Sequence, residues 1–125
     1  MQPSARTRPV VLIVEDEVLI RVDAVGSIEA AGFDVIEAAN ADEAIAILGQ
    51  RSDIRLVFTD VHMPGSMDGL KLAHFVRDRW PPVKIVATSG HARISEQDLP
   101  QGGRFLPKPY TALQIADTMH ELIHG

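Results

Sequence analysis

The sequence predicts an α/β domain in which a doubly wound, five-stranded parallel sheet is flanked by helices. Short apolar runs alternate with segments of helical spacing, a pattern typical of buried parallel strands and their crossover helices. The four clearest runs are residues 10–14, 56–59, 85–88 and 104–107. Each run ends in polar residues, and the carboxyl edge of an open parallel sheet is where functional groups gather.

The first half of the chain contains three strands and two helices. Apolar residues recur at helical spacing after the first strand, and Gly32 is a natural stop for this helix. Residues 33–38 alternate between apolar and polar side chains and predict the second strand. Asn40 is a suitable N-cap for the second helix, which should end near Gly49. The apolar positions of the first helix are Val18, Leu19, Val22, Val25 and Ile28.

The second half contains two more strands and a last helix. The third strand ends at Asp60, and a third helix should follow the loop of residues 61–69 and end before Trp80. The fourth strand, residues 83–88, leads to Ser89. A last amphipathic helix is indicated by Leu113, Ile115, Ala116, Met119, Leu122 and Ile123.

The crossover between the fourth and fifth strands is unusually short. About fourteen residues separate Gly90 from the fifth strand, and they include Pro100, Gly102 and Gly103. A parallel crossover needs a dozen or more residues. We therefore expect the fourth helix to be short, irregular or absent.

Length and composition predict one globular domain. The chain has 125 residues, of which 46% are hydrophobic and 23% are charged. We expect residues 1–8 to form a flexible N-terminal tail and residues 9–125 to form the domain, with no effector domain. The absence of cysteine excludes disulfides, thiol catalysis and thiolate metal sites.

Charge and hydropathy narrow the range of partners. The net charge of −5 argues against direct binding to nucleic acid or to an anionic membrane. No segment approaches the ~20 apolar residues of a membrane span, and no signal-peptide-like stretch precedes the first strand. We therefore expect a cytoplasmic protein.

Three carboxylates should meet at the carboxyl edge of the sheet. Glu15 and Asp16 follow the first strand, and Asp60 ends the third. Carboxylates that meet at one edge of a sheet repel each other unless one is protonated or a divalent cation neutralises them. Carboxylates, a carbonyl and water are the ligands that suit Mg²⁺. The alternative for Glu15 or Asp16 is a purely structural N-cap of the first helix.

Asp60 is also a candidate nucleophile. A carboxylate at the end of a buried strand is costly, and aspartate can attack a phosphoryl group to form an acyl phosphate. Lys108 after the fifth strand would supply a cation for the phosphoryl oxygens, and Ser89 after the fourth would supply a hydroxyl donor. Taken singly, Lys108 would be interpreted as a solvated surface lysine and Ser89 as a loop cap, and their positions after different strands on one edge are what favour the functional interpretation.

In combination, these motifs resemble the receiver domain of two-component response regulators. The resemblance extends over residues 10–123 and implies a flavodoxin-like fold with strand order 2-1-3-4-5. The motifs that carry it are Glu15-Asp16, Asp60-Val61-His62-Met63-Pro64, Ser89-Gly90 and Lys108-Pro109.

The resemblance implies a role for each residue on the metal side of the site. Asp60 would accept a phosphoryl group from a histidine kinase. Glu15 and Asp16, together with Asp60 and the backbone carbonyl of His62, would hold Mg²⁺ as the cofactor.

It also implies roles on the other side of the site. Ser89 and Lys108 would contact the phosphoryl oxygens. Phe105 would change rotamer when Ser89 moves toward the phosphate, so that both residues form the switch. The Lys108-Pro109 peptide bond should be cis, since proline makes cis cheap, at ~0.5–1 kcal/mol.

Besides the short crossover before the fifth strand, two features depart from the common family pattern. The loop 63–69 is one residue longer than usual, which leaves its path into the third helix open. His62 and His91 lie two residues past Asp60 and Ser89, at positions that flank the phosphate in the family. Each could equally be a surface histidine with no role, and neither has a companion at metal-ligand spacing.

The function favoured by the sequence is a single-domain response regulator of a two-component phosphorelay. It would take a phosphoryl group from a histidine kinase or phosphotransfer protein and signal to a downstream protein or a second copy of itself. It would catalyse its own phosphorylation and dephosphorylation without being a turnover enzyme. The alternatives are a phosphate sink or shuttle, a receiver detached from a hybrid kinase, a small phosphatase with Asp60 as nucleophile, and a pseudo-receiver that only binds partners.

Overall fold

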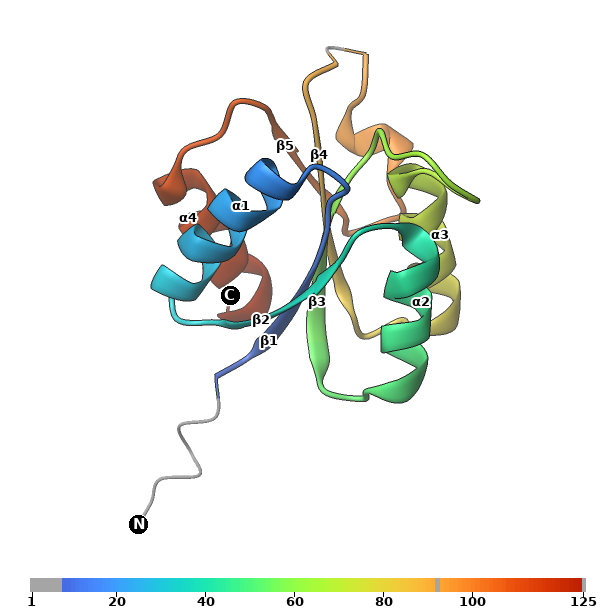
Figure 1. The fold of residues 1–125 in the computed structure, drawn as a ribbon, viewed down its shortest axis with the longest axis horizontal. Helices are drawn as coiled ribbons and strands as arrows, with labels where there is room; N and C mark the ends of the chain where they lie inside the picture. The colour runs from blue at the N-terminus through green and yellow to red at the C-terminus, as the bar shows by residue number, and fades with distance from the viewer. Residues whose placement is uncertain (1–7, 92, 125) are drawn as a thin grey trace.

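The fold is a three-layer α/β sandwich, with two helices on each face of the sheet (Figure 1). The computed structural model describes residues 8–91 and 93–124. Its strands are β1 (Val10–Val14), β2 (Asp34–Ala38), β3 (Ile54–Asp60), β4 (Lys84–Ser89) and β5 (Arg104–Pro107). Its α-helices are α1 (Val18–Ala30), α2 (Ala41–Gln50), α3 (Gly69–Arg79) and α4 (Ala112–His124).

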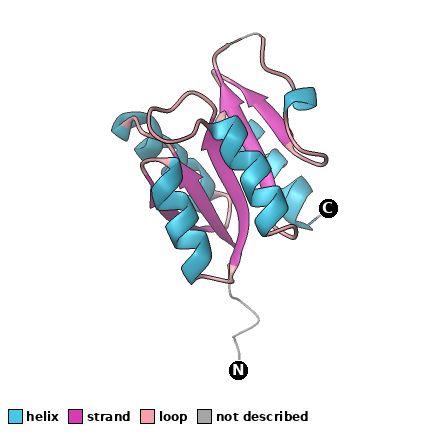
Figure 2. Ribbon diagram, turned by 90° about the vertical axis from the view of Figure 1, so that its right-hand side faces the viewer, coloured by secondary structure: helices cyan, strands magenta, loops and turns pink. Residues whose placement is uncertain are grey.

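The sheet is parallel throughout and has the strand order β2-β1-β3-β4-β5. This confirms the expected doubly wound fold. Helices α1 and α4 cover one face, and α2 and α3 cover the other, as the turned view in Figure 2 also shows. The order reverses beside β1 and β3, so the edge where both strands end is the place where such sheets bind ligands.

The core explains why the strands are continuous apolar runs. All five residues of β1 are buried, because alternate side chains enter the hydrophobic clusters on opposite faces of the sheet. The α2 and α3 face is centred on Leu12, Val57, Leu72 and Ile85. The α1 and α4 face is centred on Ile13, Ile28, Phe33, Phe58 and Met119.

The helix boundaries follow the expected local signals. Gly32 lies just after α1 with φ of 108°, a conformation that strongly favours glycine. The Asn40 side chain caps α2 by accepting a hydrogen bond from the Glu43 amide at 2.9 Å. Asp68 caps α3 in the same way, through the Lys71 amide at 2.9 Å. The N-cap of α3 had not been expected.

The apolar spacing of α1 does not mark its buried face. Val18, Leu19 and Val22 are 58%, 84% and 59% exposed, and the buried residues of this helix are Ala24 and Ile28. Helical spacing of the apolar residues therefore does not define one inward face in the first two turns of this helix. Only the later part of α1 lies over the core, and the exposed residues form a patch near the carboxyl end of the sheet. On α4, Leu113 is likewise 69% exposed.

The crossover from β4 to β5 contains no α-helix among its described residues. A single 3-10 turn, Glu96–Asp98, replaces the fourth helix, as the short spacing predicted. Leu99 is buried and Ile94 is partly buried against the α2 and α3 face, so few side chains anchor the segment.

Two other sequence-based expectations concern the ends and the surface of the chain. Residues 1–7 of the expected tail lie outside the described residues, and Arg8 donates hydrogen bonds to the carbonyls of Glu29 and Phe33. Within the described ranges, no helix is both long enough and apolar enough to cross a membrane.

Candidate functional site

The three predicted carboxylates meet at the ends of two adjacent central strands. One oxygen from each of Glu15, Asp16 and Asp60 lies within 4.8 Å of the others. Glu15 and Asp60 are only 4% and 6% exposed, while Asp16 is partly exposed. The purely structural reading of the acidic pair is not supported, because the N-cap of α1 is Glu17 and its side chain makes no capping bond.

Backbone contacts hold the end of β3 in place. The Val61 amide donates to the Thr88 carbonyl at 2.9 Å, and the Gly69 amide donates to the Val61 carbonyl at 2.8 Å. A Cβ at Gly69 would lie 2.0 Å from the Asp60 carbonyl oxygen, so only glycine allows this close approach. The longer loop 63–69 therefore still returns directly beside Asp60.

Burial raises the pKa of Glu15 above its ordinary value, and the nearby Asp60 carboxylate raises it further. The Glu17 amide, which donates to Glu15 Oε2 at 3.2 Å, and the Lys108 ammonium act in the opposite direction. A clustered set of partly desolvated carboxylates is a suitable donor set for a hard divalent cation. These residues therefore fit Mg²⁺.

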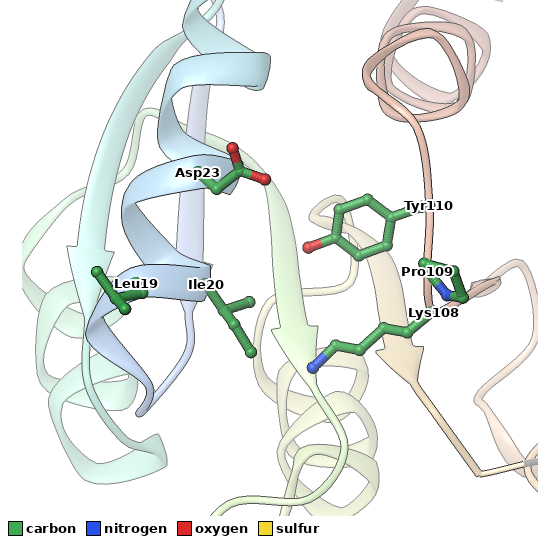
Figure 3. A pocket seen from close by; sticks show the side chains of 6 residues that line it. All are labelled: Leu19, Ile20, Asp23, Lys108, Pro109 and Tyr110. Carbon is green, nitrogen blue, oxygen red and sulfur yellow. The ribbon is translucent and has the colours of Figure 1, made fainter.

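Lys108 reaches the same carboxylates from the loop that follows β5, at the same carboxyl edge of the sheet. Its ammonium nitrogen lies 3.4 Å from Asp60 Oδ1 and 3.6 Å from Glu15 Oε1. The Lys108 amide donates to the Ser89 carbonyl at 2.9 Å, and the bond to Pro109 is cis, as predicted. Figure 3 shows the Lys108 side chain extending from the loop after β5 toward α1.

Ser89 and Phe105 line a small cavity that also contains Lys108. Ser89 is buried at the end of β4, and its hydroxyl accepts a hydrogen bond from the His91 amide at 3.0 Å. A cavity of about 280 Å³ is lined by Ser89, His91, Ile94 and Phe105, among others. The partly buried Phe105 therefore lines the same cavity as Ser89. A movement of the Ser89 side chain would change the space next to the Phe105 ring.

The two histidines near the site are a pair in space. The ring centroids of His62 and His91 are 4.0 Å apart, with an interplanar angle of 46°. Neither histidine has a companion at metal-ligand spacing along the chain, but the loops after β3 and β4 bring the two rings together in space. Spacing along the chain could not reveal this pair, since the residues are far apart in sequence.

Arg21 is a site neighbour that sequence reasoning missed. It lies on α1, and its guanidinium donates to the Glu15 carbonyl at 2.7 Å and to Glu37 Oε1 at 3.1 Å. No motif marks an arginine at this position, so the contact became visible only in the folded chain.

A shallow apolar pocket opens next to the carboxylates. It is lined by Leu19, Ile20 and Asp23 of α1 and by Lys108, Pro109 and Tyr110 after β5. Figure 3 shows the two groups facing each other, with the Tyr110 hydroxyl directed toward α1. Tyr110 packs edge-on against Phe58, with ring centroids 5.8 Å apart. Burial raises the pKa of Tyr110 to about 12.

Comparison with curated proteins gives relatives in bacterial signalling. The chain is 36% identical to the sensor kinase CckA of Brucella abortus over 90% of its length, although it spans only 12% of that protein. It is 31% identical to a glycerol metabolism activator of Pseudomonas putida, of which it spans 54%. It is 28% identical to the response regulator receiver protein CpdR of B. abortus, covering 90% of this chain and 95% of CpdR.

Solved structures agree with this result. A response regulator receiver protein from Sinorhizobium medicae has a TM-score of 0.86 and 27% identity, covering 94% of this chain and 96% of that one. The receiver domain of the hybrid histidine kinase CckA has a TM-score of 0.77 and 31% identity, covering 91% and 98%. The family model for the response regulator receiver domain matches residues 11–119. The chain therefore belongs to the response regulator receiver domain family of two-component signalling.

Proposed function

We propose that Asp60 accepts a phosphoryl group from a phosphohistidine of a histidine kinase or phosphotransfer protein. The observation that supports this most directly is the Lys108 ammonium, 3.4 Å from Asp60 Oδ1, beside three clustered carboxylates. An Asp60 oxygen would attack phosphorus and form an acyl phosphate. The phosphorus–nitrogen bond breaks, its electron pair goes to the donor imidazole, and solvent supplies the proton there.

Glu15, Asp16 and Asp60, with the His62 carbonyl, would hold Mg²⁺. When bound, this ion supplies positive charge against the carboxylates and the non-bridging phosphoryl oxygens. Lys108 would hold one phosphoryl oxygen through its ammonium, and the Ser89 hydroxyl would donate to another. Phe105 would follow Ser89 as the second switch residue.

The exposed apolar patch of α1 is the proposed docking surface for the phosphodonor. Val18, Leu19 and Val22 are large, apolar and more than half exposed, which is costly for a surface that never meets a partner. Leu19 also lines the pocket that contains Lys108, so a protein bound here would stand beside the acceptor. The donor must bring its imidazole to Asp60, and this surface adjoins that position.

Labelling separates the acceptor from the rest of the site. Wild-type protein incubated with labelled acetyl phosphate and Mg²⁺ should acquire acid-stable, base-labile label, and EDTA should prevent this. Asp60→Asn should acquire none, because the amide is not a nucleophile. Label retained in the Asn variant at the wild-type level would sink the assignment.

The donor surface has its own test. Leu19→Glu should slow transfer from a phosphorylated kinase by about tenfold or more, since a charge in an apolar contact costs on the order of 1–3 kcal/mol. Phosphorylation of the same variant by acetyl phosphate needs no docking surface and should stay at the wild-type rate. Equal losses with both donors would place the defect in the site and not in docking.

The short crossover favours a second candidate, a phosphate sink or shuttle. The fourth helix belongs to the surface by which receivers usually report phosphorylation, and here a 3-10 turn replaces it. A domain that only drains or relays phosphoryl groups needs no such surface. The two candidates differ in whether phosphorylation changes residues outside the pocket, including any surface for a downstream protein or a second copy.

A further inference from the structure

The loop that carries the acidic pair is fixed from two sides. On the β2 side, the Glu15 amide donates to the Ala38 carbonyl at 3.0 Å. On the α1 side, the Glu15 carbonyl accepts a hydrogen bond from Arg21 Nη1 at 2.7 Å. Both backbone polar groups of Glu15 are thus hydrogen-bonded, one in the peptide unit before its Cα and one in the unit after it, at the residue whose side chain meets Asp60.

Arg21 is itself held in a defined orientation. Its Nε donates to Glu37 Oε1 at 3.1 Å, and its own amide donates to the Glu17 carbonyl at 2.9 Å. The Arg21 side chain is only 18% exposed, whereas that of Glu37 is 49% exposed. The guanidinium therefore links α1, the loop after β1 and strand β2 through one rigid, planar group.

A metal site needs this kind of support. Mg²⁺ demands near-ideal octahedral geometry at about 2.0–2.1 Å, so a small displacement of a carboxylate costs affinity. Groups that orient ligands without touching the ion typically change affinity 10–100-fold when they are lost. The contact of Arg21 with Glu15 is to the backbone, and its charge is matched by Glu37, so its contribution is to position the loop.

We propose that Arg21 is a positioning residue for the Mg²⁺ site, acting through the Glu15 carbonyl. This rests on the proposed role of Glu15, Asp16 and Asp60 as metal ligands. Loss of the guanidinium frees the Glu15 peptide on the α1 side, and the acidic pair then samples orientations that do not bind the ion. Asp60 is untouched by this change.

Direct titration of the metal tests the proposal without any phosphoryl transfer. Arg21→Met keeps most of the stem and removes every donor, and its Mg²⁺ dissociation constant by calorimetry should rise about tenfold or more. Arg21→Lys retains one donor that cannot reach both acceptors at once, and its dissociation constant should rise about threefold. Glu37→Gln keeps the acceptor for Nε and should stay within twofold of wild type.

Arg51→Met is the matched control. Arg51 is an exposed arginine bonded through two nitrogens to Asp53, at 2.9 and 2.6 Å, and these bonds involve none of Glu15, Asp16 and Asp60. Loss of this ion pair should leave the Mg²⁺ dissociation constant unchanged. A general weakening of the fold would affect both methionine variants in thermal unfolding, whereas the positioning role affects the metal titration of Arg21→Met alone.

The rate profile gives a second readout. With acetyl phosphate, the Mg²⁺ concentration for half-maximal phosphorylation should rise in Arg21→Met, while the rate at saturating Mg²⁺ stays within about twofold. A Mg²⁺ dissociation constant for Arg21→Met within twofold of wild type overturns the proposal. If that variant does not fold, an unchanged value for Arg21→Lys does the same. Wild-type protein that binds no Mg²⁺ would instead overturn the metal site itself.

Discussion

The two halves of the candidate site are built in different ways. Glu15 follows the central strand β1 and Asp60 ends β3, and the elements after them are the full helices α1 and α3. Ser89 ends β4 and Lys108 follows β5, and the described part of the crossover between these strands contains only a three-residue 3-10 turn. The half that would hold the metal and the acceptor is therefore tied closely to the core. The half that would contact the phosphoryl oxygens adjoins the crossover between β4 and β5, which few buried side chains anchor.

This difference suggests a division of labour. Chemistry benefits from groups held in one geometry, whereas a switch needs two arrangements of similar free energy. A phosphoryl group on Asp60 shifts an equilibrium only through contacts that differ between the two states. Ser89 and Lys108 are placed to make such contacts, and we expect the crossover beside them to adjust at little cost because few of its side chains are buried.

The largest expected effect is a difference in phosphorylation rate between a variant of the metal half and a variant of the half that would contact the phosphoryl oxygens. Glu15→Gln removes a proposed metal ligand and should slow phosphorylation by acetyl phosphate 100-fold or more at low Mg²⁺, as a rough expectation. Ser89→Ala removes one hydrogen bond of about 1 kcal/mol and should slow it only about fivefold. Initial rates at one fixed Mg²⁺ concentration give the comparison. Equal losses would mean that both halves contribute alike to the chemistry.

Hydrogen exchange should show the same contrast in stability. Amides of residues 93–103 outside the 3-10 turn should exchange on the order of 100-fold faster than those of β1 and β3, because few buried side chains anchor them. Ile94 and Leu99 are the main apolar anchors of this segment. Protection equal to that of the central strands would show that the crossover is as firmly held as the metal half.

A third effect concerns stability without metal. The pKa of Glu15 is raised in the folded state, chiefly by burial and next by Asp60, so folding favours its protonated form. Its contribution to stability is thus fully present below the unfolded pKa and is lost as pH rises through the folded pKa. Glu15→Gln should therefore unfold at a higher temperature than wild type in EDTA at neutral pH. Near pH 4, below the ordinary glutamate pKa of 4.5, this advantage should shrink.

Mg²⁺ supplies the control for that measurement. It should stabilise wild-type protein at neutral pH, since it binds the folded carboxylates, and should do so far less in the Gln variant. A Gln variant less stable than wild type in EDTA at neutral pH would mean that the Lys108 ammonium outweighs burial at this carboxylate.

The sequence predicted the strands and the polar residues that end them for a physical reason. Strands buried on both faces must be continuous apolar runs, so each carboxyl end is visible as the point where polarity returns. The short crossover followed from a count of residues and the glycines within it. The exposed patch of Val18, Leu19 and Val22 could not be predicted, because apolar spacing does not tell burial in a core from burial under a partner.

Contacts between distant segments were likewise beyond the sequence. The pairing of His62 with His91 and the bond from Arg21 to Glu15 depend on how loops and helices pack at one edge. No spacing along the chain encodes them. In this site, the residues proposed to touch the phosphoryl group or the metal were readable from sequence, and those that orient them were not.

A smaller effect should appear in the output half on activation. Chemical shifts with and without beryllofluoride and Mg²⁺ should change at Phe105, Tyr110 and the start of α4 as well as in the pocket. Phe105 borders the hollow beside Ser89, so movement of the hydroxyl should reach its ring. Changes confined to the pocket would favour the phosphate sink over the switch.

The smallest expected effect is a shift in the pKa of Tyr110. This residue lies where the two halves of the site meet, in the pocket between α1 and the loop after β5. Tyr110 is the sole tyrosine of the chain, so tyrosinate absorbance follows it alone. Burial raises its pKa to about 12, and the carboxylates of Glu15, Asp23 and Asp60 contribute next. Because folding favours the neutral phenol, the fold should lose stability as pH rises from the ordinary value of 10.0 toward about 12.

Circular dichroism recorded over the same pH range shows whether the protein is still folded at each point of the titration. Protein unfolded in urea provides the reference, because its tyrosine should titrate near the ordinary value of about 10. Glu15→Gln should lower the folded midpoint slightly, since it removes one negative charge but leaves the burial of the ring unchanged. A folded midpoint near 10 would mean that Tyr110 is solvated and does not close the pocket between α1 and the loop after β5. The apolar patch of α1 would then be separated from Lys108 by water, and the link between donor docking and the acceptor would be lost.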